Sequence, residues 1–308
     1  MIFKENLEKS IVFVLLLILI YLLFLRREDP LPSLPPLHLF QVNQPKLNRL
    51  LVVYIYAQTH NYSRSNLQFF IQIGMKFNSQ VDYFIIIQQN EKNRTDLNSL
   101  PRLPSNGKYI EHKNECFDIG TFGWFLLSNH TNRRNYEYFA LLNSSCRGPY
   151  LVSSIENWYD PFIRLLNNLT KLVGPTINCQ SGLHVQSYAW ILDKQAVEIL
   201  LDDDKVLSCH ETQVAAIYSG EIKASDVLFQ KGFSVTSVMK KYENIDLVNK
   251  RSEFCSDWKE EDPFSQIDGI YVDPFDRIFV KYKTGQIFDH LRLRLQVYDQ
   301  WLLFNPSK

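Results

Sequence analysis

Apolar, β-branched runs recur along the chain at a nearly constant interval. They occupy residues 50–57, 81–88, 108–112, 136–143 and 171–177, so their starts lie 31, 27, 28 and 35 residues apart. Segments with helical spacing separate them, at 65–77, 120–129 and 153–168. A strand and a helix that alternate about every 30 residues are typical of βαβ units. Because the strands are continuously apolar, the pattern predicts an α/β fold with a doubly wound, mainly parallel sheet covered on both faces.

The N-terminal segment differs from the rest of the chain. Ser10–Leu25 is an uncharged apolar run with charges on both flanks, which predicts a transmembrane helix. A cleaved signal peptide is the alternative, but the small residues that cleavage needs do not follow the run. Five prolines at 26–45 then predict an extended stalk. The expected organisation is a cytosolic tail at 1–9, a signal anchor at 10–25, a stalk at 26–46 and a folded domain at 47–308.

The orientation of this anchor is not set by its flanking charges. Two lysines precede the apolar run and two arginines follow it, which is a tie under the positive-inside rule. Sequence positions that favour a lumenal domain are the N-glycosylation sequons, at Asn61, Asn93, Asn129, Asn143 and Asn168. We therefore expect a single-pass type II protein of the Golgi or endoplasmic reticulum membrane. A cytosolic domain with empty sequons is the alternative.

Charge and cysteine content narrow the classes of partner and compartment. Lys plus Arg equals Asp plus Glu at 33 each, and this balance argues against a nucleic-acid partner. The five cysteines are too few for a disulfide framework and lack the Cys-x-x-Cys spacing of zinc sites. One or two disulfides with a free thiol would suit a lumenal enzyme, and buried free cysteines are the other interpretation.

Polar and turn-forming residues follow the fourth apolar run directly. In an open parallel sheet, ligands bind beyond the carboxyl ends of the strands, so these side chains are expected to enter that crevice. A rim of amides and hydroxyls suits a ligand that is rich in hydroxyl groups, although such residues also serve turn backbone. The candidates for binding such a ligand here are Asn143, Ser144, Ser145, Gly148 and Pro149.

Three further stretches carry candidate site residues. Asp118 and Gly120 precede a predicted helix, where the aspartate could cap that helix or contact a nucleotide. Glu221 lies on a helix expected to end at Gly232, and it could act as a general base or lie on the surface. The entry to another apolar strand holds His184, Gln186 and Ser187.

Six ordered landmarks between about residues 115 and 281 give the chain a family resemblance. They are CFDIGTFGW, YFALLNSSCRGPYL, KLVGPTINC, HVQSYAWILDKQAVEIL, CHETQVAAIYSGEIKASDVLFQKGFSV and DGIYVDPFDRIFVK. In order and spacing they resemble glycosyltransferase-like proteins related to the bacterial rhamnan synthesis protein F, especially eukaryotic membrane-anchored relatives. The resemblance implies a GT-A-like fold that transfers a sugar from a nucleotide-sugar donor to a glycan hydroxyl.

The resemblance also implies roles for single residues. Asp118 and Gly120 would lie near the nucleotide, the segment around Asn143 near the donor, and His184, Gln186 and Ser187 near the acceptor. Glu221 or Asp118 would be the catalytic base.

One departure from the family bears on the cofactor. Bacterial relatives carry an aspartate where this chain has Ser144, which puts dependence on a divalent metal such as manganese in doubt, and we predict no metal ligand. Arg147 could replace the metal charge at the donor diphosphate, or could be structural. A glycan-binding or scaffold protein without activity is the alternative function.

Overall fold

A computed structural model describes the folded part of the protein. The described residues are 49–91, 94–152, 156–179, 181–239, 273–283 and 289–304, with 242, 245, 247–249, 255, 266–267 and 270–271. The predicted anchor at 10–25 and the stalk at 26–46 lie outside them. Within the described residues, no helix combines the length and the apolar character that a membrane span requires.

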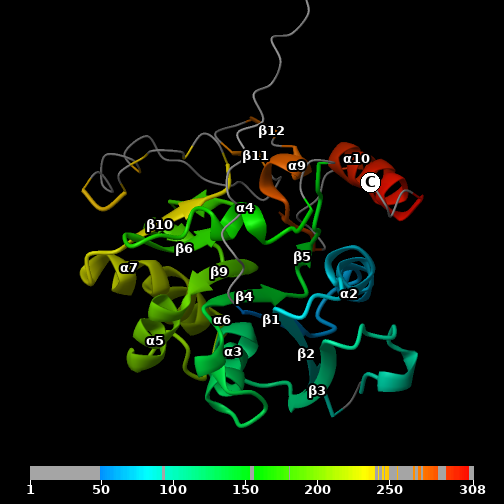
Figure 1. The fold of residues 1–308 in the computed structure, drawn as a ribbon, viewed down its shortest axis with the longest axis horizontal. Coiled ribbons are helices and arrows are strands. Elements are labelled where there is room, and N and C mark those ends of the chain that lie inside the picture. The colour runs from blue at the N-terminus through cyan, green and yellow to red at the C-terminus, as the bar shows by residue number, and fades with distance from the viewer. Residues whose placement is uncertain are drawn as a thin grey trace, which may run out of the picture. The chain divides into compact units, whose positions relative to one another are not determined.

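A seven-stranded sheet forms the centre of the fold (Figure 1). Every neighbouring pair of strands is parallel except the two pairs that involve β9, which runs against β4 and β6. The structure therefore confirms a mixed α/β fold with a mainly parallel sheet. In spatial order the strands are β10 (Ser234–Ser237), β6 (Thr170–Gly174), β9 (Ala189–Asp193), β4 (Tyr138–Asn143), β1 (Leu50–Tyr56), β2 (Val81–Gln89) and β3 (Gly107–Lys113).

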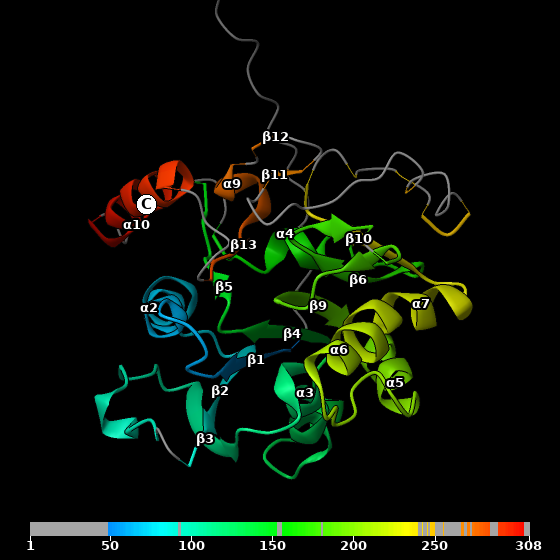
Figure 2. The same cartoon turned by 180° about the vertical axis from the view of Figure 1, so that it is seen from behind.

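Helices cover both faces of this sheet, as Figures 1 and 2 show from opposite sides. One apolar cluster joins alternate residues of β1 to α3 (Phe117–Leu127), α5 (Lys194–Asp202) and α7 (Lys223–Gln230). The remaining residues of β1 pack with α2 (Ser63–Phe69) and α4 (Asp160–Ile163) on the other face. All seven residues of β1 are buried for this reason, which explains its continuously apolar sequence.

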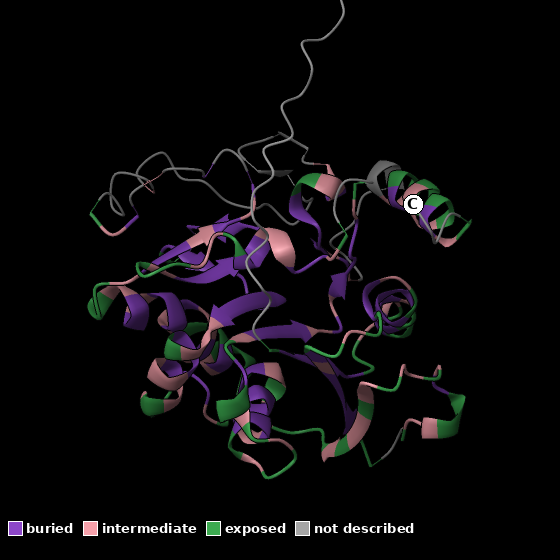
Figure 3. Ribbon diagram, in the orientation of Figure 1, coloured by how far each residue is buried: buried purple, intermediate pink, exposed green. Residues whose placement is uncertain are grey.

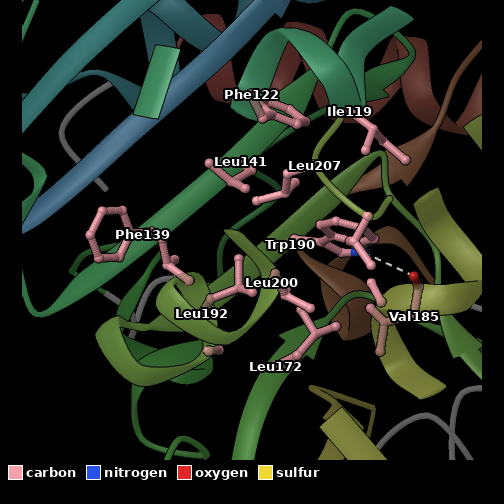
Figure 4. Close-up of a cluster of buried hydrophobic side chains, with 14 of the residues drawn as sticks. Ile119, Phe122, Phe139, Leu141, Leu172, Val185, Trp190, Leu192, Leu200 and Leu207 are labelled. Atoms are coloured by element: carbon pink, nitrogen blue, oxygen red, sulfur yellow. Dashed lines mark hydrogen bonds between the residues drawn. The ribbon is translucent and has the colours of Figure 1, made fainter. Parts of the chain in front are cut away.

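Trp190 of β9 lies at the centre of the first cluster (Figure 4). Its side chain is completely buried among the leucines of β4, β6 and α5, and its indole nitrogen donates to the carbonyl of Val185 at 2.8 Å. The inner strands of the sheet are buried in the same way, whereas the edge strand β3 has no buried residue and the outer faces of the helices are exposed (Figure 3). The apolar strands thus supply the core that holds the loops at their carboxyl ends.

Further elements complete the described structure. Among the described residues of the predicted helix at 153–168, only α4 is helical, because Pro161 lacks the N–H that a helix arriving from upstream would use. The others are the π-helices η1 (Phe70–Gly74) and η4 (Ala216–Ile222), the 3₁₀ turns η2 (Leu97–Ser99) and η3 (Arg133–Asn135), helices α6 (Gln213–Ala215), α9 (Pro274–Arg277) and α10 (Asp289–Phe304), and strands β5 (Cys146–Arg147), β7 (Ile177–Asn178), β8 (His184–Val185), β11 (Gln266–Ile267), β12 (Ile270–Tyr271) and β13 (Val280–Lys281).

Two disulfides join segments that are distant in sequence. Cys116, just before α3, is bonded to Cys209, and Cys179 is bonded to Cys255. The fifth cysteine, Cys146, is a buried free thiol. The structure thus agrees with two disulfides and one free thiol, rather than with five free cysteines.

Candidate functional site

A cavity of about 1040 Å³ opens at the carboxyl ends of the parallel strands. From β1 the chain continues to β2 on one side, while β4 pairs with β1 on the other, so the strand order reverses at β1. A reversal of this kind leaves a crevice between the diverging loops, which is where α/β sheets bind ligands. Thr59 and His60 after β1, Gln88 in β2 and Ser144 after β4 all line it.

The loop after β4 holds one wall of the cavity in place. Ser144 donates its hydroxyl to the carbonyl of Ala57 at 3.0 Å and so ties the end of β4 to the end of β1. Asn143 accepts from both the backbone N–H and the hydroxyl of Ser145, at 3.0 and 2.6 Å. With its oxygen occupied in this way, the amide of Asn143 must direct its NH₂ group elsewhere.

That NH₂ group donates to the carboxylate of Asp118, in the first turn of α3. The other carboxylate oxygen of Asp118 accepts from the N–H of Ile119 at 3.0 Å. Burial raises the pKa of Asp118, and the nearby charge of Glu221 raises it further against the effect of these hydrogen bonds. Asp118 is therefore a carboxylate that takes up a proton more readily than an exposed aspartate.

Glu221 lies in η4, a π-helical segment between α6 and α7. Segments of this type are frequent at functional sites because they displace side chains from regular helix positions. Ser187 donates to one carboxylate oxygen of Glu221, and His184 Nε2 lies 3.4 Å from the other. Burial alone would raise the pKa of Glu221, but His184, Lys281 and Ser187 outweigh it and lower the pKa to about 2.

The second nitrogen of His184 fixes how its ring can act. Its Nδ1 atom lies 2.8 Å from the carbonyl of Gly182, which can only accept, so Nδ1 carries a proton. Its Nε2 atom is the one that faces the carboxylate of Glu221.

Several predicted site residues come together in this cavity. Those that line it are Asp118, Asn143, Ser144, Ser145, His184, Gln186, Ser187 and Glu221. They come from four separate stretches of sequence, and their assigned roles stay predictions. Gln186 is buried and accepts from the hydroxyl of Thr176 at 3.4 Å.

Four predicted donor-binding residues lie outside the cavity lining. Arg147 forms an ion pair with Asp299 of α10 and packs its guanidinium over two aromatic rings. A side chain on Gly120 would meet the carbonyl of Ser208 at 2.7 Å, and one on Gly148 would meet the carbonyl of Ile278 at 2.5 Å. Pro149 follows Gly148 and is buried. Close packing against these carbonyls explains why glycine occupies positions 120 and 148.

Three basic side chains at the cavity were not singled out from the sequence. Lys281 and Lys283, in and just after β13, both line it, as does His210 beside the disulfide at Cys209. No hydrogen-bond partner reaches His210 Nε2 from the described part of the chain, although this atom is buried. The alternation in FVKYK at 279–283 was the available signal, since residues two apart on a strand share a face.

The side chains that line the cavity do not fit a divalent cation. Among the residues that the structure describes, no group of three or more His, Cys, Asp and Glu side chains is placed to hold a metal ion. The carboxylates of Asp118 and Glu221 instead share their surroundings with Lys281 and Lys283, whose charges act on them. The positive charges of these ammonium groups repel a second cation.

Comparison with known proteins gives likenesses in structure alone. The sequence matches no known protein family, and it matches no curated protein. Glycosyltransferase GlyE of Streptococcus pneumoniae TIGR4 is 13% identical with a TM-score of 0.43, and its apo form is 12% identical with a TM-score of 0.40; each comparison covers 82% of this chain and 60% of that one. Mannosyltransferase PcManGT of Pyrobaculum calidifontis, in complex with GDP-Man and Mn²⁺, is 7% identical with a TM-score of 0.39 and covers 62% of this chain and 55% of that one.

These three structures are sugar transferases by name. This chain covers less than two thirds of the length of each. At these identities and TM-scores, the likeness carries no assignment of activity.

Proposed function

We propose that the protein is a glycosyltransferase that moves a sugar from a nucleotide-sugar donor to a hydroxyl group of a glycan. The observation that carries this proposal is the cavity at the strand reversal, where a carboxylate with a raised pKa, a second carboxylate and two lysines face one space. Its volume of about 1040 Å³ is that of a site for a large small-molecule ligand. The six sequence landmarks described above point to the same chemistry.

Asp118 is the better of the two candidate bases. A base is effective when its pKa approaches the working pH, and the pKa of Asp118 is raised while that of Glu221 is lowered to about 2. In the reaction, the acceptor oxygen forms a bond to the anomeric carbon as the bond from that carbon to the diphosphate oxygen breaks. Asp118 takes the hydroxyl proton, and the nucleoside diphosphate leaves with the electron pair.

Glu221 has a positioning role in this scheme. Its carboxylate is held by Ser187 and His184, so it can orient an acceptor hydroxyl as a hydrogen-bond acceptor. The proton that Asp118 takes from the acceptor passes to solvent before the next turnover.

The test is nucleoside diphosphate release from a panel of nucleotide sugars by the purified full-length chain. We expect release with one nucleotide sugar, faster when a glycan acceptor is added. Asp118→Asn should abolish release and leave donor binding intact, whereas Asp204→Asn, at an exposed position outside the cavity, should change neither. Glycan binding by a folded protein without any release would support the non-catalytic alternative.

We further propose that the folded domain lies in the lumen of the Golgi or endoplasmic reticulum, behind a signal anchor at 10–25. Two disulfides support this proposal, because they persist in oxidising compartments. The sequon asparagines Asn61, Asn129 and Asn168 are exposed. Asn143 instead holds Asp118 inside the cavity, so we expect no glycan there.

Enzymatic deglycosylation of the protein from cells tests this arrangement. A mobility shift that shrinks in Asn129→Gln and Asn168→Gln, and stays unchanged in a Ser145→Ala variant that removes the sequon at Asn143, would support it. A protein with no shift at all would support a cytosolic domain.

A further inference from the structure

Strand β13 and the residues just after it place two lysines at the same wall of the cavity. Lys281 and Lys283 both line it, while Tyr282 between them is buried on the opposite side and packs over the guanidinium of Arg147. This alternation is that of an extended chain, in which residues two apart share a face about 6.6 Å apart. The ammonium groups can therefore converge on one ligand that carries two negative charges.

The segment is held in a separate two-stranded sheet rather than free in solution. β13 pairs antiparallel with β5, as Figure 2 shows, and the N–H of Tyr282 donates to the carbonyl of Ser145 at 2.6 Å. Asn66 of α2 is completely buried and donates to the carbonyls of Ser144 and Tyr282, both at 2.9 Å. The lysines are thus held against the loop that positions Asn143 and Asp118.

The lysine pair has an electrostatic cost in the free protein. Both side chains are half-buried, and among the described residues no carboxylate lies within ion-pair distance of either ammonium group. Burial lowers the pKa of Lys283, and the charge of Lys281 lowers it further against the opposing effect of Glu221 and Asp118. The other acids of the cavity lining, Glu115 and Glu211, are exposed to solvent.

Two like charges that lie side by side in a cavity without ion-pair partners repel each other. An anion that binds between them reduces this repulsion. A diphosphate supplies two negative charges and several acceptor oxygens for lysine N–H groups. The sequence suggested Arg147 for this task, but its charge is already neutralised by Asp299.

We propose that Lys281 and Lys283 bind the donor diphosphate directly and take the place of a divalent cation. This inference rests on the proposed function, since it assumes a nucleotide-sugar donor. The diphosphate then lies on the lysine side of the cavity, and the anomeric carbon lies toward Asp118 and Glu221. The nucleotide sugar then binds without a metal ion, which agrees with cavity side chains that do not fit a divalent cation.

Isothermal titration of the full-length protein with UDP, GDP and their sugar conjugates tests this, in EDTA and in manganese. We expect one nucleotide to bind equally well in both buffers. Lys281→Met and Lys283→Met, which keep side-chain length but remove the charge, should each weaken binding at least about tenfold, as loss of a charged hydrogen bond does. Lys281→Arg and Lys283→Arg should retain most of the affinity, and the exposed Lys205→Met should match the wild type.

Different failures identify different errors. Binding that requires manganese, or that survives both methionine variants, would overturn the lysine proposal and leave the transferase proposal standing. No binding of any nucleotide by the folded wild-type protein would overturn the proposed function as well. Melting temperatures of the unliganded variants show whether each variant is folded.

Discussion

Replacing the buried Asn66 should destabilise the protein more than any surface asparagine does. Its side chain donates to the carbonyls of Ser144 and Tyr282 and accepts from Arg147 Nη1 at 3.1 Å. A neutral hydrogen bond contributes about 1 kcal/mol and one from a charged donor about 2 kcal/mol. Asn66→Ala should therefore lower the free energy of unfolding by about 4 kcal/mol.

Urea denaturation followed by fluorescence measures this loss. The matched control is Asn98→Ala, because Asn98 is exposed and bonds only to Asp96 among the described residues. We expect the control to change the free energy of unfolding by less than about 0.5 kcal/mol. A loss below about 1 kcal/mol for Asn66→Ala would refute the idea that this side chain fastens β13 to the cavity wall.

Three further predictions concern packing, acid stability and covalent links. A Cβ on Gly123 would lie 1.9 Å from the carbonyl oxygen of Leu207, so Gly123→Ala should lower the free energy of unfolding by about 2 kcal/mol or more, measured in urea. Because the pKa of Glu221 falls from 4.5 to about 2 on folding, its ionisation stabilises the protein above pH 4.5, and this contribution is lost as the pH falls toward 2. At 1.36 kcal/mol for each pKa unit, the stability difference between wild type and Glu221→Gln should shrink by up to about 3 kcal/mol over that range. Removing the Cys179–Cys255 link, which spans a sequence separation of 76, should cost about 4 kcal/mol in the double serine variant.

A specific result would contradict each of these three predictions. Unchanged stability in Gly123→Ala would mean that α3 does not pack against the carbonyl of Leu207 as described. A wild type and a Glu221→Gln variant that lose stability in parallel between pH 4.5 and 2 would show that Glu221 is not stabilised as an anion. Equal stability of the oxidised protein and the double serine variant would argue against the bond to Cys255.

The sheet could be predicted from the sequence because its strands are buried on both faces. The apolar runs at 50–57 and 81–88 became β1 and β2 with nearly the same bounds. The hydrophobic periodicity predicted the helix at 153–168 less well, because Pro161 limits where the helix can begin. The direction of β9 could not be predicted, because an antiparallel strand inserted between parallel ones has the same apolar composition.

The cavity was predicted in part. Residues that directly follow a parallel strand, such as Asn143 and Ser144, had to lie at the carboxyl edge, and Glu221 was identified from its place at a helix end. Lys281 was missed because the alternation in FVKYK covers only five residues and does not reveal that this segment pairs with β5 beside the cavity. Arg147 was assigned to the donor because its partner Asp299 is 152 residues away, and a single sequence does not reveal such pairs.

Thermal stabilisation by nucleotide sugars tests the central proposal most directly. The purified full-length protein is melted with each member of a panel of nucleotide sugars, with and without manganese. A ligand that binds only the folded state at 100 times its dissociation constant adds about 2.7 kcal/mol to the stability. We predict that one nucleotide sugar raises the melting temperature equally in both buffers. A folded protein whose melting temperature no nucleotide sugar changes would contradict the account.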